Sequence, residues 1–229
     1  LDPRTPVLVG AGQVNDRRDD VTLEPVDLMA TAAREAADPR VLQAVDAIRV
    51  VNLLSWRYRD PGLLLGARIG AGSAATYYTG VGGNTPQSLL NQACVDIQQG
   101  RAGVILLAGA ETWRTRKKLK AKGIRPDWTR QDESVPVPPG GEHEVPMAGP
   151  AEDHVGLLLP SHVYPLFEEA LRISNGESVE AHRARLGELW AQFSAVAAAN
   201  PHAWVRDQVS AEEITTAGPD NRMISWPYP

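Results

Sequence analysis

Apolar residues in the first half of the chain form short continuous runs, separated by longer stretches in which they recur at helical spacing. Strands of a parallel sheet are covered on both faces, so the continuous runs predict four strands, at 6–14, 47–54, 74–81 and 103–109. Apolar positions three and four residues apart predict helices at 24–37, 61–70 and 86–97. This alternation indicates an α/β fold with a mostly parallel sheet and covering helices.

A glycine-rich turn leads from the third predicted strand into the third predicted helix. Gly82 and Gly83 suit a backbone turn that a side chain would obstruct, and Thr85 with the proline after it is typical of a helix start. The amides of Gly83, Asn84 and Thr85 therefore point at a helix N-terminus and can hold a carbonyl or carboxylate oxygen. The alternative, that the two glycines only permit the turn, remains open.

The composition changes after Trp113. Residues 114–125 are strongly basic, and 131–146 are rich in proline, glycine and glutamate without periodicity, which predicts irregular structure. An amphipathic helix is expected over 177–199, ended by Asn200-Pro201. The change divides the chain into an α/β domain, 1–112, and a second domain, 113–229, that is irregular and helical.

Charge and cysteine content restrict the class of protein. A net charge of -5 argues against a general nucleic-acid binder, and the single cysteine excludes an internal disulfide. No apolar run approaches the roughly 20 residues of a membrane span, and no signal peptide is recognisable, so we expect a soluble, cytoplasmic protein. Because the sequence begins at Leu1 without methionine and ends at Pro229 outside any predicted element, we also expect a fragment of a longer protein.

Common catalytic motifs are missing from the sequence. The five histidines show no metal-ligand spacing, and no serine lies in a nucleophile elbow, so no metal is expected. A GxG at 10–12 suggests a dinucleotide turn, but the third glycine and an immediate helix are lacking. Close packing of a strand end against a neighbour is the better interpretation.

Residues 80–113, with AGAET at 108–112, resemble the N-terminal half of the thiolase superfamily. In that family a strand leads to a catalytic cysteine at the N-terminus of a buried helix, and the next strand ends in a glycine-rich turn followed by Glu. MAGPAED at 147–153 is similar to a run in the helical loop domain of thiolases, and 200–214 is closer to the sterol-carrier-protein-x branch. The resemblance implies a thiolase-like N-terminal half, 1–112, followed by a loop domain, 113–229.

The resemblance also implies a function, with one departure from the family pattern. The position of the nucleophilic cysteine falls on Gly83, so the chain looks like an acetyl-CoA acetyltransferase of lipid metabolism without its covalent nucleophile. Acyl-CoA is the implied substrate: Met147 would lie along the pantetheine arm, and Arg114 and Arg116 near the phosphates. The alternatives for these residues are packing within the loop domain and a solvated basic face.

The resemblance also implies the C-terminal thiolase half as a partner, because that half carries the family's catalytic histidine and second cysteine. A homodimer is allowed as well. Two further functions stay open, an aldolase-like C–C lyase and a non-catalytic acyl-CoA binding or interaction protein. A base near the turn would favour catalysis, whereas an apolar pocket without a base would favour binding.

Cys94 is the only thiol in the chain. It lies about ten residues into the predicted helix, roughly 14 Å from its N-terminus, on the apolar stripe between Leu90 and Ile97. We therefore expect an inert core thiol and no acyl-enzyme on this chain.

Overall fold

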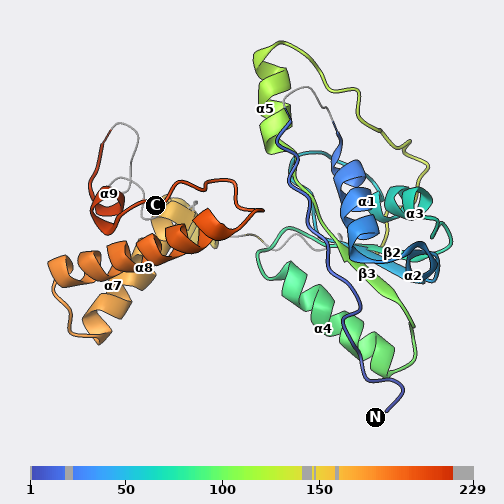
Figure 1. Ribbon diagram of the computed structural model, residues 1–229, viewed down its shortest axis with the longest axis horizontal. Helices are drawn as coiled ribbons and strands as arrows, with labels where there is room; N and C mark the ends of the chain where they lie inside the picture. Colours follow the sequence, from blue (N-terminus) through green and yellow to red (C-terminus); the bar gives the residue numbers. More distant parts are fainter. Residues whose placement is uncertain (1, 19–22, 141–145, 147, 158–159, 219–229) are drawn as a thin grey trace. The chain divides into compact units, whose positions relative to one another are not determined.

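The computed structural model in Figure 1 describes residues 2–18, 23–140, 146, 148–157 and 160–218. The chain forms two compact units, 1–145 and 146–229. The boundary expected at 112/113 falls inside the first unit, because hydrogen bonds from Thr129 and Gln131 fasten the segment after 112 to Glu24 and Asp60. The assignment of 1–112 and 113–229 to thiolase domains stays a prediction.

A three-stranded parallel sheet forms the centre of the first unit. Its strands are β1 (Ala47–Val50), β2 (Ala75–Tyr78) and β3 (Ile105–Ala108), in the order β2-β1-β3. Ala47 is in register with Ala75 on one side and with Ile105 on the other. The α/β fold with a parallel sheet is thus confirmed, and three of the four predicted strands form within their predicted ranges.

Five helices accompany the sheet: α1 (Pro25–Ala36), α2 (Pro39–Gln43), α3 (Pro61–Ile69), α4 (Thr85–Gln98) and α5 (Trp113–Ala121). The first four have proline in their first turn, where its missing N–H breaks no helical hydrogen bond. The helices α1, α3 and α4 match the predicted ones. The short α2 and the basic α5 were not predicted as helices.

Side chains alternate between the two faces of the sheet along β1. Ile48 and Val50 are fully buried in the core that α1 and α3 cover. Arg49 points to the opposite face, where it pairs with Asp96 of α4. The helix α4 thus lies across the sheet from α1 and α3 (Figure 1), and a charged pair joins it to the central strand.

The strand expected at 6–14 does not form. No ladder hydrogen bonds join these residues to the sheet in the described structure, and Leu8 is 83% exposed. Instead, a Cβ at Gly10 would lie 2.0 Å from the Ala36 oxygen, and one at Gly12 would lie 2.1 Å from the Ala32 oxygen. The two glycines therefore allow the segment to pack closely against the α1 backbone, as the packing interpretation proposed. This contact with α1 explains why the segment runs beside the helix and does not pair with the sheet as a strand.

The helix α4 is buried at fewer positions than its apolar spacing predicts. Only Leu89 and Ala93 are buried, whereas Leu90 and Val95 are exposed. Helical spacing identified the stripe that contacts the sheet, but it also assigned to the core neighbouring apolar positions that nothing in the described structure covers.

The second unit is helical in its described part. Its helices are α6 (Pro150–His154), α7 (Pro160–Ser174), α8 (Val179–Ala199) and α9 (Ala211–Thr215). Buried His182 of α8 contacts Glu168 of α7 at 3.0 Å and Glu177 at 2.7 Å, which ties the two long helices together. The helix predicted at 177–199 is confirmed, and the helical character expected of this region holds.

Candidate functional site

The glycine turn after β2 places backbone amides at the start of α4. The Thr85 amide donates to the Gly82 carbonyl at 3.2 Å, and the Thr85 hydroxyl donates to the same oxygen at 2.8 Å. The amides of Gly83 and Asn84 have no hydrogen-bond acceptor among the described residues, and both residues are exposed. Two of the three expected donors are therefore free for a ligand, and the third is used by the turn.

The expectation that a side chain would obstruct this turn is wrong. Neither Gly82 nor Gly83 adopts a positive φ, and a Cβ at Gly83 would meet no atom within 4 Å. At Gly82 the nearest atom to a Cβ would be the Asn84 Oδ1, at 2.9 Å, the end of a flexible side chain. Position 83 can accordingly hold a cysteine or any small side chain, and its glycine leaves open space at the helix N-terminus.

Glu111, in the AGAET run, fastens the loop after β1 to the end of β3. Its carboxylate accepts hydrogen bonds from the Leu54 amide at 2.7 Å and the Ser55 amide at 2.8 Å. The Ser55 hydroxyl in turn accepts from the Thr112 amide at 2.9 Å. Glu111 therefore positions two loops at the carboxyl edge of the sheet. Sequence reasoning missed this role, although the AGAET run after a predicted strand marks the residue.

The same loop is tied to the end of β2, just before the glycine turn. Asn52 donates from its amide to the Thr79 hydroxyl at 2.9 Å and from its side chain to the Thr79 carbonyl at 3.1 Å. The Tyr78 hydroxyl accepts from the Leu53 amide at 3.0 Å, and burial raises the pKa of Tyr78. Side-chain hydrogen bonds thus fix all three strand ends around the turn.

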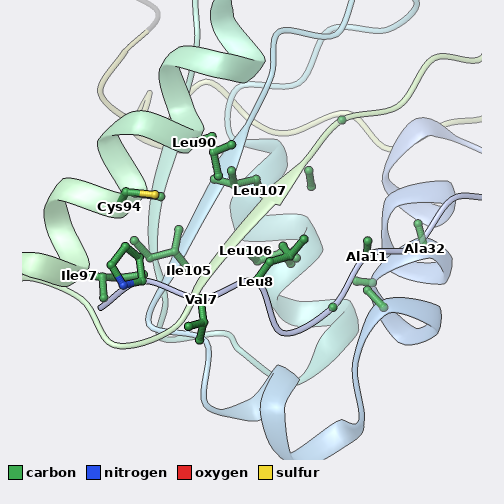
Figure 2. Close-up of a pocket in the computed structure, with 18 of the residues that line it drawn as sticks. Val7, Leu8, Ala11, Ala32, Leu90, Cys94, Ile97, Ile105, Leu106 and Leu107 are labelled. Carbon is green, nitrogen blue, oxygen red and sulfur yellow. The ribbon is translucent and has the colours of Figure 1, made fainter. Parts of the chain in front are cut away.

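A cavity of about 590 Å³ lies along the free edge of β3, between α1, α4 and residues 6–12 (Figure 2). Cys94 and Leu90 of α4 line it opposite Leu107, and no acidic, basic or histidine side chain lines it. Cys94 is half-buried and borders this space. The expectation of a core thiol is therefore corrected: Cys94 lines an apolar cavity, well away from the N-terminus of α4.

The two arginines expected near a phosphate group lie on α5. Arg116 donates to the Ser55 carbonyl at 2.9 Å, and its guanidinium lies 5.2 Å from the centre of the Trp113 ring. Arg114 donates to the Arg17 carbonyl at 3.1 Å. The contacts place Arg116 beside the loop that Glu111 holds. Met147 lies outside the described residues, so its place near a ligand stays a prediction.

Comparison with solved structures finds chains that are similar to this one. No protein-family profile and no curated protein sequence matches the chain. A solved structure, described as a monomeric SCP2-thiolase-like protein type 1 from Mycobacterium smegmatis, is similar, with a TM-score of 0.69 and 28% sequence identity. The match covers 97% of this chain and 41% of the other, so the chain spans about two fifths of that protein. None of the described helices is long and apolar enough to cross a bilayer. The chain is thiolase-like in fold.

Proposed function

We propose that this chain belongs to a thiolase-like acyl-CoA protein of lipid metabolism that is related to acetyl-CoA acetyltransferases but lacks the covalent cysteine nucleophile. Gly83 carries the proposal. It occupies the position of the family's cysteine, leaves open space there, and is followed by the free amide of Asn84 at the start of α4.

The turn offers electrostatic chemistry without a thiol. Amides at a helix N-terminus stabilise negative charge, so those of Gly83 and Asn84 can accept the carbonyl oxygen of a thioester. Carbon–carbon bond formation or cleavage also needs a base, and in thiolases this comes from the C-terminal half. We therefore expect the chain of residues 1–229 to be inactive alone, and the C-terminal half and acyl-CoA to be its partners, with a homodimer allowed. The proposal requires acyl-CoA as its small-molecule ligand and does not require a metal ion.

The arginines and Met147 complete the proposed coenzyme A contacts. Arg116 lies at the Ser55 loop with its charge exposed, and Arg114 lies two residues before it on α5. In the proposal these two side chains meet phosphate groups, and Met147 lies along the pantetheine arm. The proposed location is the cytoplasm, which rests on the composition and the single cysteine.

A second function, non-catalytic binding of acyl-CoA, is favoured by the cavity along β3. Its lining is mostly aliphatic and contains no carboxylate, histidine, lysine or arginine. A space of this kind can accept an acyl chain but supplies no general base for catalysis. The aldolase-like alternative requires such a base, and nothing in this cavity favours it.

Mass spectrometry and calorimetry together test these proposals. We expect the chain to bind acetyl-CoA in a calorimetric titration and to show no acetyl adduct in its intact mass. Gly83→Cys supplies a thiol at the turn and is expected to gain an adduct at position 83. A stable adduct on Cys94 of the unsubstituted protein would contradict the proposal, and absence of any coenzyme A binding would remove both functions.

A further inference from the structure

Positive charge is concentrated on α5 and the turn that follows it. Residues 113–125 contain seven of the chain's 23 Lys and Arg and no Asp or Glu, although the whole chain has a net charge of -5. Gly123 adopts a φ of 69° just after the helix, and the Ile124 amide donates back to the Leu119 carbonyl at 2.9 Å. The chain thus reverses direction here, which brings Arg125 back towards the residues of α5.

A pocket of about 400 Å³ lies between α5 and the loop after it. Arg116 and Lys120, four residues apart on one helix face, line one side, and Arg125 and Arg130 come from the loop. No carboxylate lines the pocket, and across the described part of the chain none of these four cations makes an ion pair. Four like charges therefore line one concave space, and none of the described carboxylates lines it with them.

The remaining wall of the pocket is fixed by hydrogen bonds and ring packing. Trp56 donates from its indole nitrogen to the Thr129 carbonyl at 2.9 Å and packs edge-on against buried Trp128, with ring centres 5.1 Å apart. The Arg130 guanidinium lies 5.7 Å from the centre of the Trp56 ring. Thr129 is held in turn by the Glu24 carboxylate, at 2.9 Å and 2.7 Å. The loop that carries Arg125 and Arg130 is thereby held in place before any ligand binds, which lowers the entropic cost of binding.

We infer that this pocket binds the phosphate groups of a small, multiply charged ligand. Guanidinium groups match phosphate oxygens in pairs, and several like charges in one concave space are best neutralised by an anion with more than one charge. The four cations line a single open concavity, which suits a compact anion and is unlike the extended basic track that binds nucleic acid. Inorganic pyrophosphate and the nucleotide end of coenzyme A share this chemistry, and only the second source rests on the proposed function.

Calorimetry with inorganic pyrophosphate tests the pocket directly. At low ionic strength the full chain should bind pyrophosphate saturably, with one ligand per chain. The double substitution Lys120→Gln/Arg125→Gln should raise Kd by about tenfold or more, because it removes two charge-assisted contacts. Arg116 and Arg130 are left intact, because both also contact the protein itself.

Lys117→Gln/Lys122→Gln is the matched control, because it removes two positive charges from the same segment at exposed positions that do not line the pocket. It should change Kd by less than about twofold, since only screened, long-range attraction is lost. Thermal unfolding of both double variants should match that of the unsubstituted chain. Equal weakening by the two double substitutions, or no saturable binding of pyrophosphate, would overturn the inference.

Two further ligands identify the source of the phosphate. Weaker binding of coenzyme A by the pocket variant, with binding of pantetheine unchanged, supports entry of the nucleotide end into this pocket. Weaker binding of pyrophosphate alone supports a free phosphate anion as the ligand and leaves the inference intact even if coenzyme A does not bind at all. Tight binding of a single-stranded RNA that pyrophosphate fails to displace would contradict the inference.

Discussion

Arg49 is a charged residue in the middle of the central strand. Its side chain is 11% exposed and pairs with Asp96 of α4, whose side chain is 18% exposed. Asp96 also accepts a hydrogen bond from Arg101 Nε at 2.6 Å, and within the described residues the Arg49 Nη1 atom is buried without a partner. The pair therefore holds α4 on the sheet at a point where an unpaired charge would be costly.

Asp96→Asn should destabilise the first unit. The substitution leaves the buried Arg49 charge without its counter-charge, which costs about 3 kcal/mol in the free energy of unfolding for a pair this enclosed. Urea unfolding measures the change. Asp127→Asn, at an exposed aspartate, is the control and should stay within about 0.5 kcal/mol. Equal effects of the two substitutions would show that the pair contributes nothing.

The same pair predicts a dependence of stability on pH. The Arg49 guanidinium, with a smaller contribution from Arg101, holds the pKa of Asp96 below its ordinary value of 3.8. A lowered carboxyl pKa stabilises the folded state above pH 3.8 and ceases to do so as the pH falls through the folded value. The difference in unfolding free energy between the unsubstituted chain and Asp96→Asn should therefore be constant near neutrality and shrink below that pH. A difference that grows on acidification would contradict this assignment.

Gly83→Cys should create a thiol with a lowered pKa. The open space at position 83 accepts the side chain, and the N-terminus of α4 favours the thiolate by about 0.3–1 kcal/mol, or roughly 0.2–0.7 pKa units. The pH dependence of alkylation by iodoacetamide measures this in a Cys94→Ala background. Gly72→Cys, also at an exposed glycine with open space but outside any helix, is the matched control. Identical thiol pKa values at the two positions would remove the electrostatic argument for the turn.

The position of the candidate site at a helix start was predictable from the sequence, but only part of its chemistry was. Gly83 lies just before α4, as expected, whereas its match to the cysteine position of thiolases rests on the family's helix length and stays a prediction. The sequence could not predict that Gly83 has a negative φ or that the Thr85 amide donates to the Gly82 carbonyl. Glycine permits many backbone conformations, and its neighbours in the sequence do not select one of them. Glu111 could be located from AGAET, but its two amide partners come from a loop more than 50 residues earlier in the sequence.

Glu24 joins several elements just before the start of α1. Its buried carboxylate accepts hydrogen bonds from the Tyr58 hydroxyl at 2.8 Å and from the Thr129 amide and hydroxyl, and it pairs with Arg68 of α3 at 2.5 Å. Burial and this carboxylate raise the pKa of Tyr58, so its hydroxyl remains a donor at neutral pH. A single side chain thus holds two helices and the loop after α5 together.

Glu24→Gln should loosen the loop after α5 more than the sheet. An amide lacks the charge that pairs with Arg68 and can accept fewer of these bonds, so we expect a loss of about 2–3 kcal/mol in unfolding free energy. Hydrogen exchange should rise first over residues 125–135 and little in α4. Glu35→Gln, at an exposed position of α1, is the control. Uniformly raised exchange across the first unit would indicate global destabilisation in place of the local effect.

Elements were predictable where apolar spacing and packing agree. The helices α1, α3, α4 and α8 show the expected period, and β1, β2 and β3 lie inside continuous apolar runs. Residues 6–14 show the same apolar pattern as those strands, yet the close approach of Gly10 to α1 determines their path. The helix α5 was missed because its mostly charged surface gives no apolar period, and α7 because Pro165 lies within it.

The molecule as a whole exposes many large apolar side chains. In the second unit Phe167 of α7 is 59% exposed, and Phe193 and Val196 of α8 are 51% and 69% exposed. In the first unit Leu8 and Leu90 are exposed beside the cavity along β3. Several large exposed apolar side chains on one helix, or beside one cavity, are typical of faces that a further chain segment or partner covers.

The chain should therefore bind a hydrophobic dye and tend to self-associate. We expect fluorescence of anilinonaphthalene sulfonate to rise on mixing with the purified chain, because dyes of this class adsorb to exposed apolar surface. Phe167→Ser/Val196→Ser should reduce that signal without lowering the unfolding free energy by more than about 1 kcal/mol, because both side chains are already exposed and lose little burial. Ala170→Ser/Ala195→Ser, at exposed small residues of the same two helices, is the control and should leave the signal unchanged. The opposite result is a chain that stays monomeric in size-exclusion chromatography, unfolds cooperatively and binds no dye. It would show that these apolar faces do not associate in solution, and it would contradict the expectation of a covering partner.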